Sequence, residues 1–591
     1  RLGLVLAILG RNLRRAWICG ALPNELQFIL RLLIVPKPKI YSMGPFNYLF
    51  YIATAIYHDP FTSGLSGAEQ TQTISLANLT SLEELKVRTG YKFGIVEPSE
   101  ITFHKQDGVQ LQSIKEVVWC KSIIEIRIAK IPIHRVPGPD AFPIVGNRLE
   151  LYPDILGNVE RLCARYGGII KTINMGSVTY YTNDPSIARH VLRESEFFTK
   201  KTSDPAHPLH FMADQEALFT CDSDSPAFGP SHRFIPPCMA PKAIRHYTPS
   251  VQQCVQKVLP VLDAISDSSL AFNVYQYMFK LAGQVIWKIV FGADLGHFDS
   301  LDAKPFETIR DLGQYVALMK RVSLRGQWYG YLPFGDPRRM REARDRVWKG
   351  IGETIEQAAR TGTDNRDLPL QEAALHAACL ADYLQRAVDN EGNKLPREYL
   401  VSNCVILFGA GFLTSSSLLA WCIFALCRYE GVQDRLLQEL FVKETQRMHN
   451  PSFQTARNAR RDVVLPGGKA IPAGSVVIPM FPALHKNPAH WDNPARFDPE
   501  RWGTPAVKKL PRAAYTPFAA GSRGCIGFSL ALLEVKMAMA ILVYRYKFLD
   551  ASLEPVVYDP EFLVVRPLNF YAKAAIRTVL PVARGEGAGA Y

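Results

Sequence analysis

The feature that most constrains this chain is a glycine-rich loop that holds one cysteine at the start of a helical run. Gly521, Gly524 and Gly527 surround Cys525, and residues 528–545 continue as a strongly apolar helical pattern. The first N–H groups of a helix are unpaired and carry partial positive charge, and both properties favour a thiolate, the form of cysteine that binds metal ions. The loop therefore predicts a metal ligand at Cys525. An ordinary buried cysteine in a helix-entry loop is the alternative.

Composition excludes several classes of protein. The 591 residues are 48% hydrophobic and 21% charged, unlike a disordered or collagen-like chain. A mean hydropathy of −0.02 argues against a polytopic membrane protein. The eleven cysteines are odd in number and include no Cys-x-x-Cys pair, which argues against a disulfide framework and a zinc knuckle. Outside residues 1–40 no basic tract with interleaved aromatic residues stands out, so nucleic acid is not an expected partner.

The cysteine loop also carries a family signature. Phe518, Gly521, Arg523, Cys525 and Gly527 resemble the haem-binding signature of the cytochrome P450 family at each of its fixed positions. The resemblance implies that haem b is the cofactor and that the Cys525 thiolate is its iron ligand. It also implies that these five residues form the cofactor-binding loop and that Arg523 pairs with a haem propionate.

A second block of motifs upstream resembles the same family. Glu444 and Arg447 have the i,i+3 spacing that places two side chains on one face of a helix. Arg457 and then the run FDPERW, which contains Arg501, follow in the order of the P450 segment from its K helix through its meander. The resemblance implies that Glu444, Arg447 and Arg501 form a buried structural network. It further implies that Arg457 contacts a haem propionate.

The expected oxygen-binding helix departs from the family pattern. Residues 398–428 read as one long apolar helix, and its run AGFLTS resembles the P450 I-helix motif. The resemblance implies that Gly411 opens the helix locally and that Thr414 is a catalytic residue that hydrogen-bonds the bound oxygen. Leu413 occupies the acidic position and cannot relay a proton, so proton delivery has to use water or another acid. The alternative is a buried helix whose hydroxyl groups bond back to backbone carbonyls.

A further departure lies in residues 218–247, which align without gaps to the C-helix region of the fatty-acid-hydroxylase branch of P450s. The tryptophan and histidine of that branch correspond to Phe228 and His232 here. The resemblance implies that His232 contacts a haem propionate, with Arg233 as the neighbouring candidate. Three prolines between residues 230 and 237 are expected to break a regular helix.

The chain is also shortened between two expected helices. The run YEGVQDRLLQEL resembles the P450 J helix, and FVKETQR follows it at once. The family normally has another helix and loop between these segments. Either a real deletion or a mis-spliced gene explains the difference.

The N-terminal part of the chain matches no recognised motif, and residues 1–130 stay unassigned. Residues 1–40 contain seven Lys or Arg residues and one acid, and residues 1–35 suit a basic helix on a membrane surface. Residues 40–57 carry no charge and are either a short membrane anchor or a buried core segment. The Pro- and Gly-rich residues 131–147 resemble the hinge that follows a P450 membrane anchor. Residues 131–591 are therefore expected to form the catalytic domain.

The expected fold is mainly α, a P450 helical prism with small β-sheets after the unassigned N-terminal segment. The resemblance implies a haem-thiolate monooxygenase that inserts one oxygen atom from O2 into a small apolar organic substrate. The chain contains no Gly-rich flavin or nicotinamide signature, so electrons are expected from an external NADPH-cytochrome P450 reductase. The implied location is a membrane surface, that of the endoplasmic reticulum facing the cytosol.

Two other functions remain open. A P450-fold isomerase or dehydratase that acts on a peroxide needs no electron supply, and Leu413 favours it. A degenerate, non-catalytic haem-binding protein from an incomplete gene is the second alternative, favoured by the shortened segment and the proline-rich C region.

Overall fold

The computed structural model describes residues 52–59, 68–75, 79–105, 107–120, 124–128, 134–213, 216–361, 366–433, 438–452 and 455–578. The chain divides into two compact units, Arg1–Ile52 with Ser75–Ala77, and Ala53–Ile74 with Asn78–Tyr591. Almost all of the first unit lies outside the described residues. The basic helix expected over residues 1–35 and the part of the apolar stretch before residue 52 lie there as well.

The described end of that apolar stretch, residues 52–57, belongs to a strand and therefore not to a membrane-spanning helix. β1 (Ile52–Asp59) pairs in parallel with β5 (Ile124–Ile128). β1 has the sequence IATAIYHD, and its β-branched and aromatic residues favour an extended backbone. The two strands are the centre of a five-stranded mixed sheet in the order β2-β1-β5-β3-β4, completed by β2 (Ala68–Ser75), β3 (Ile101–Lys105) and β4 (Gln110–Leu111).

Two helices accompany this sheet. α3 (Leu82–Phe93) begins at Ser81, whose hydroxyl accepts a hydrogen bond from the Glu84 N–H, and ends at Gly94 with φ of 73°. α4 (Ile114–Trp119) is capped in the same way by Ser113. The described parts of residues 52–128 therefore form a small α/β arrangement, which the sequence did not predict.

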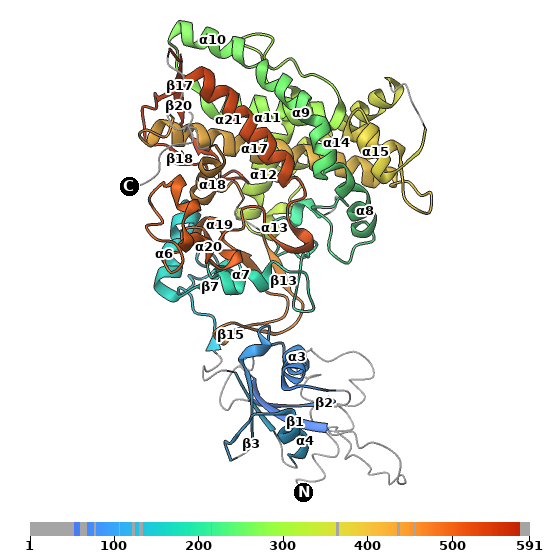
Figure 1. Cartoon of the computed structure of the whole chain (residues 1–591), viewed down its shortest axis with the longest axis vertical. Coiled ribbons are helices and arrows are strands. Elements are labelled where there is room, and N and C mark those ends of the chain that lie inside the picture. Colours follow the sequence, from blue (N-terminus) through green and yellow to red (C-terminus); the bar gives the residue numbers. More distant parts are fainter. Residues whose placement is uncertain are drawn as a thin grey trace. The chain divides into compact units, whose positions relative to one another are not determined.

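The rest of the described chain is mainly helical (Figure 1). Its longer helices are α6 (Ile155–Tyr166), α8 (Phe228–Cys238), α9 (Pro241–Gln256), α10 (Leu259–Ser268), α11 (Val274–Phe291), α12 (Glu307–Leu324), α14 (Gly335–Thr361), α17 (Arg397–Arg428), α18 (Gln438–Met448) and α21 (Phe528–Arg545). The shorter ones are α5 (Arg148–Leu151), α7 (Pro185–Val191), α13 (Gln327–Gly330), α15 (Leu370–His376), α16 (Leu380–Arg386), α19 (Phe481–Leu484) and α20 (Pro505–Lys508). The helix expected over residues 528–545 is confirmed as α21, and the mainly α fold is confirmed with it.

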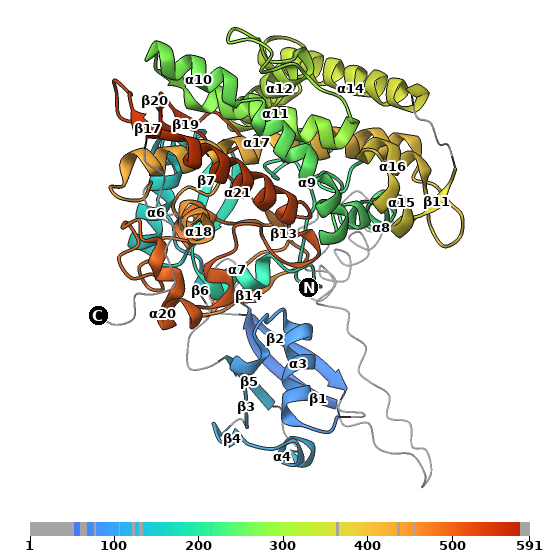
Figure 2. The same ribbon diagram turned by 45° about the horizontal axis from the view of Figure 1, so that its top comes forward.

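The core is built around α17, the 32-residue helix that packs against α11, α14, α18 and α21 (Figure 2). Among the described helices it is the one that is long and apolar enough to cross a membrane. However, 72% of its 18-residue apolar window is buried inside the protein. A helix that is buried on most sides is expected to be apolar all round, so this length and composition are those of a core helix.

Small sheets flank the helices. The largest has the order β7-β8-β16-β13-β9, with β7 (Ile169–Asn174), β8 (Ser177–Thr182), β16 (Val476–Pro479), β13 (Arg457–Ala459) and β9 (Phe198–Thr199). The others contain β6 (His134–Arg135), β14 (Val463–Leu465) and β15 (Lys469–Ile471); β10 (Phe272–Asn273), β17 (Tyr546–Asp550) and β20 (Tyr571–Ile576); β11 (Leu368–Pro369) and β12 (Ala387–Val388); and β18 (Val557–Tyr558) and β19 (Pro567–Leu568). The pairing of β13 with β9 places Asn458 opposite Thr199, and this register brings Arg457 close to the chain that follows β9.

One local expectation is wrong. α8 is a continuous helix despite its prolines. Pro230 lies in its first turn, where backbone N–H groups have no partners, whereas Pro236 and Pro237 each remove a donor from its last turn. In the run that resembles a J helix, residues 431–433 form a turn and residues 438–440 belong to α18, while residues 434–437 lie outside the described residues.

Candidate functional site

The cysteine loop is a closed turn that leads into α21. The Cys525 N–H donates to the Phe518 carbonyl at 2.8 Å, and the Gly524 N–H donates to the Gly521 carbonyl at 2.9 Å. Gly521 has φ of 75°, and a Cβ at this position would lie 3.0 Å from the Leu192 carbonyl oxygen, so glycine is needed there. The turn fixes the Cys525 side chain before the helix begins.

The surroundings of Cys525 have two opposite effects on the pKa of its thiol. Cys525 is exposed in the chain, whereas the cysteines packed into the helices are mostly buried. Crowding by the surrounding protein raises the pKa of the Cys525 thiol, and the Gly527 N–H lowers it in part. The thiolate preference expected from the helix N-terminus is therefore the smaller effect. A metal ligand has to lose this proton, so deprotonation would accompany metal binding.

The α17 turn that contains Thr414 is less buried than the turns on either side of it. Ala410 is exposed, and Gly411 and Thr414 are half-buried, whereas Leu413 is buried in the apolar core. The Thr414 hydroxyl donates to the Ala410 carbonyl at 2.8 Å. α17 is continuous through Gly411, so the local opening expected there is absent. A Cβ on Gly411 would instead lie 2.7 Å from two carbons of Ile286, so glycine allows α11 to approach.

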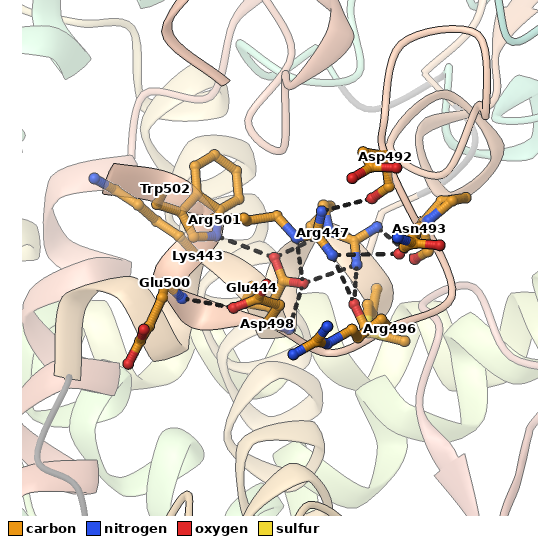
Figure 3. Close-up of polar contacts among 12 residues, drawn as sticks. Lys443, Glu444, Arg447, Asp492, Asn493, Arg496, Asp498, Glu500, Arg501 and Trp502 are labelled. Carbon is orange, nitrogen blue, oxygen red and sulfur yellow. Dashed lines mark hydrogen bonds and ion pairs between the residues drawn. The ribbon is translucent and has the colours of Figure 1, made fainter. Parts of the chain in front are cut away.

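Glu444 is the centre of a buried charge network (Figure 3). Its carboxylate accepts hydrogen bonds from Arg447 Nη2 at 2.8 Å and Nε at 3.0 Å, from Arg501 Nε at 3.0 Å, from the Asp498 N–H at 2.9 Å and from Trp502 Nε1 at 3.1 Å. Glu444 and Arg447 are 0% exposed and Arg501 is 8% exposed.

The two arginines in turn hold the meander. Arg447 donates to the carbonyl oxygens of His485, Pro494 and Arg496, and Arg501 donates to those of Asp492, Asn493 and Arg496. The structure thus brings together the three residues that the sequence places in this network. Its effect is to tie residues 485–502 to α18.

Three cations lie close together near the cysteine loop. Arg457 on β13 and Lys200 just after β9 are buried, and Arg523 is half-buried. Burial, followed by the charges of Arg457 and Arg523, holds the pKa of Lys200 well below its usual value. Burial likewise lowers the pKa of Arg457 to about 10, and the charge of Arg523 adds to this effect. Glu194 lies 3.8 Å from Arg457 Nε, so acidic compensation is weak.

One of these three cations, Arg457, has incomplete hydrogen bonds, whereas Lys200 and Arg523 have partners. Arg457 Nε and Nη2 have no hydrogen-bond partner among the described residues. Lys200 donates to the Phe219 carbonyl and lies 3.8 Å from the centre of that ring. Arg523 donates to the Leu218 and Cys221 carbonyls and to the Ser223 hydroxyl. This excess of positive charge suits an anionic ligand.

The two candidate propionate contacts on α8, His232 and Arg233, have different neighbours. The Arg523 guanidinium lies 3.7 Å over the Phe228 ring, and the exposed His232 ring lies 5.3 Å from the same phenyl ring. His232 is therefore close to the group of cations. Arg233 instead donates to Asp389 at 2.5 Å, so its charge is already paired.

Comparison with known proteins explains this arrangement. Residues 136–441 and 440–574 match the family described as Cytochrome P450. The chain belongs to the cytochrome P450 family. The resemblance seen in the sequence is thereby confirmed, and so is haem b as cofactor, because it is the prosthetic group of P450 proteins.

Relatives of this P450 occur in fungi and mammals. It is 46% identical over 536 residues to the cytochrome P450 monooxygenase alnD of Emericella nidulans, and the match covers 86% of this chain and 97% of that protein. It is 26% identical over 318 residues to leukotriene-B4 omega-hydroxylase 3 of Mus musculus, with 49% of this chain and 60% of that protein covered. The haem domain of the solved cytochrome P450DA has a TM-score of 0.64 at 22% identity, covering 76% of this chain and 98% of that chain, which shows a common fold.

The residues present fit haem b. The unpartnered Nε and Nη2 atoms of Arg457, with Lys200 and Arg523 beside them, suit two propionates, and Cys525 supplies a free sulfur. The exposure of Ala410 on an otherwise buried helix fits a flat group against that turn. Among the described residues no group of three or more His, Cys, Asp or Glu side chains could hold a metal ion.

Sequence reasoning missed two buried ionisable groups, Lys200 at this site and Glu534 on α21. Lys200 lies in the run FFTKKTSD, which contains no signal that separates it from a surface lysine. Glu534 is the one acid in the apolar helix FSLALLEVKMAMAILVYR, and that isolation was a usable signal.

Proposed function

We propose that this P450 is a haem-thiolate monooxygenase that inserts one oxygen atom from O2 into a small apolar organic substrate. The observation that carries the proposal is the exposed thiol of Cys525, held in a closed loop beside three cations whose only ion pair among the described residues is a long one, from Arg457 to Glu194. The name of the Emericella nidulans relative, a P450 monooxygenase, supports the reaction class.

In this proposal the residues of the chain hold and orient the cofactor. Cys525 is the iron ligand, in the loop formed by Phe518, Gly521 and Gly527. Haem bound through a thiolate supplies the chemistry that cleaves the O–O bond of dioxygen. Arg523, Arg457 and Lys200 neutralise the propionates, and His232 is a further propionate contact.

Thr414 is the proposed catalytic residue on α17. Its hydroxyl lies on the half-buried side of the helix and donates a hydrogen bond to the Ala410 carbonyl at 2.8 Å. The hydroxyl oxygen keeps lone pairs that can accept a hydrogen bond from water or a proton donor. Thr414 is thus suited to hold a proton next to bound oxygen.

The proposed electron donor is an external NADPH-cytochrome P450 reductase. Lys508, Lys509 and Arg512 are exposed in the segment that leads to the cysteine loop. Basic side chains at this place suit an acidic docking surface, which would speed association at low salt.

The proposal is tested by the absorption spectrum of the reduced, haem-loaded protein under carbon monoxide. We expect the thiolate-specific Soret band, and its loss in Cys525→Ala. Cys163→Ala, which removes a buried thiol of α6, is the matched control and keeps the band. Oxygen consumption with NADPH and reductase, accompanied by substrate-dependent product, then shows monooxygenation.

Other outcomes contradict the proposal. A thiolate band with turnover of peroxides but no dependence on reductase would favour the isomerase or dehydratase. Protein that binds no haem would favour the degenerate alternative. A band that persists in Cys525→Ala would assign the iron ligand to another residue.

We also propose that the protein lies on an anionic membrane surface, with the cytosolic face of the endoplasmic reticulum as the membrane. Large exposed apolar residues gather on two neighbouring segments: Phe142, Ile144, Leu149, Trp328, Tyr331 and Phe334. Arg148 of the first segment donates to the Leu324 carbonyl, just before the second segment. The neighbouring arginines Arg325 and Arg338 are about half-exposed or more. Aromatic residues flanked by basic ones are typical of a membrane-surface contact.

Flotation with vesicles tests this part of the proposal. We expect the full chain to float with vesicles that contain phosphatidylserine, and the double variant Trp328→Ser, Phe334→Ser to float less. Val557→Ser, an exposed apolar residue on β18, is the control. Equal flotation of the double variant and the control would exclude this patch.

A further inference from the structure

The end of α3 and the chain directly after it, residues 91–97, contact the P450 part of the protein, residues 136–574. We call residues 91–97 the docking segment. β14 is an edge strand of the sheet β14-β15-β6. Its Val464 N–H donates to the Gly94 carbonyl at 2.9 Å, and the Val96 N–H donates to the Val464 carbonyl at 3.2 Å. Because an edge strand leaves backbone groups unpaired, these bonds make the docking segment a short additional strand on the P450 sheet.

The C-terminus of α3 is capped by an arginine of the P450 part. The last four carbonyl groups of a helix have no partner within it, and a cation at this end suits the helix dipole. Arg461 donates through Nη1 to the Tyr91 carbonyl at 2.9 Å and through Nη2 to the Lys92 carbonyl at 3.0 Å. A Cβ on Gly94 would lie 2.2 Å from the Asp462 carbonyl oxygen, so this close approach requires glycine. The docking segment is therefore attached to the P450 part by specific contacts.

Val96 of the docking segment places its side chain in the core of the P450 part. It is 5% exposed and belongs to one buried cluster with Phe198 of β9 and Ala459 of β13. Lys200 follows β9 directly, and Arg457 is the first residue of β13. Both are cations of the proposed haem site. The cluster that contains Val96 thus includes the two strands that carry these cations.

Glu97 of the docking segment contacts another element that leads to the site. Its carboxylate accepts hydrogen bonds from Arg189 Nη2 at 2.6 Å and from His190 Nε2 at 3.1 Å, both on α7. The buried side of α7 contributes Ala188 to a cluster against which Ala519 of the cysteine loop packs. α7 therefore connects Glu97 to the loop that holds the proposed iron ligand.

We propose that the docking segment positions the haem site, with Val96 acting through β9 and β13 and Glu97 acting through α7. The α/β arrangement within residues 52–128 is then a working part of the haem-binding unit and not a spacer that precedes it. Val96 and Glu97 are not among the residues proposed to touch haem, so both are positioning residues. This inference rests on the haem site of the proposed function.

Hydrogen–deuterium exchange of the full, haem-loaded chain tests whether the segment is docked. The Val464 N–H is bonded to the Gly94 carbonyl and should exchange slowly. Arg461→Ala should speed its exchange by about fivefold, the factor that one typical net hydrogen bond contributes to local stability. Arg460→Ala, which changes the adjacent exposed arginine, is the matched control. Equal exchange of the Val464 N–H in the two variants overturns the proposal.

Haem transfer to apomyoglobin tests the effect of Val96 on the site. We expect Val96→Ala to release haem about threefold faster or more, because coupling between residues of one contact network corresponds to factors of about 2 to 100. Val117→Ala is the matched control, since Val117 of α4 is also buried but lies outside that cluster. The propionate bending band in resonance Raman spectra should shift in Val96→Ala and stay unchanged in Val117→Ala. A general loss of stability would affect both variants alike.

The same transfer assay tests Glu97. Glu97→Gln and Arg189→Gln should each speed haem release, and the double variant should be slower than the product of the two single effects, because contacting residues are not additive. The control is Glu83→Gln, which breaks the ion pair with Lys86 on α3 and leaves α7 untouched. Independent effects of Glu97→Gln and Arg189→Gln would contradict a role of Glu97 through α7.

The outcomes separate this inference from the proposed function. If the wild type lacks the thiolate-specific Soret band, the proposed function fails whatever these variants do. If the wild type has that band and both Val96→Ala and Glu97→Gln release haem like their controls, this inference alone fails. Glu97→Gln, which changes a half-buried residue, keeps that conclusion available where Val96→Ala does not fold.

Discussion

Replacement of Glu444 by glutamine is expected to destabilise the protein strongly. The Glu444 carboxylate is the common acceptor for two arginine side chains that are 0% and 8% exposed. Glutamine keeps the shape of glutamate, but it removes the negative charge and turns an N–H2 group toward N–H donors. Leaving buried charges without their partner costs about 3 to 5 kcal/mol. Because native proteins are stable by about 5 to 15 kcal/mol, this loss is a large fraction of the total.

Urea unfolding followed by tryptophan fluorescence measures the effect. The control is Glu342→Gln, which breaks an exposed i,i+4 ion pair with Arg338 on α14. Such a pair contributes about 0.3 to 0.5 kcal/mol. The reasoning is refuted if Glu444→Gln and Glu342→Gln lower the free energy of unfolding by amounts that agree within about 1 kcal/mol, the upper end for exposed pairs.

Three further predictions follow from single positions. Lys200→Met is expected to weaken haem retention about tenfold or more, because a hydrogen bond to a charged group contributes about 1.5 to 3 kcal/mol. Haem transfer to apomyoglobin measures this, and an unchanged transfer rate would show that Lys200 does not contact the haem. Gly521→Ala should lower stability by about 1 to 2 kcal/mol, seen as a lower thermal midpoint, because residue 521 has φ of 75°; an unchanged midpoint would mean that the loop relaxes. Because the pKa of Glu534 is raised from 4.5 to about 8, the folded state holds a proton that the unfolded state loses. Wild-type stability should therefore fall between about pH 4.5 and 8 by up to about 1.4 kcal/mol per pH unit relative to Glu534→Gln; parallel pH profiles would contradict this.

Local features of this fold could be predicted because they depend on neighbouring residues. The limits of α21 follow from the glycine loop before it and the continuous apolar run within it. The pairing of Glu444 with Arg447 follows from their spacing on one helix. Arg501 could be placed only by its resemblance to a known family, because the meander that carries it has no regular periodicity.

Features that depend on distant segments could not be predicted. Lys200 meets Arg457 only because β9 pairs with β13, a contact between residues far apart in the chain. Gly411 suggested an opening in α17, but the contact that decides its role is with Ile286 of another helix. The strand over residues 52–59 was hidden because a short apolar run is compatible with a helix or a strand until its partner strand is known.

The sheet formed by residues 52–128 limits how the chain can be shortened for experiments. Its first strand in the sequence, β1, is an interior strand between β2 and β5, the last of the five strands in the sequence. A deletion that runs past residue 52 would strip one side of β5 of its backbone partners and create two new sheet edges prone to aggregation. If such a fragment became insoluble, the cause would be the disrupted sheet, and the result could not be used to judge membrane attachment. A truncation therefore has to end before Ile52.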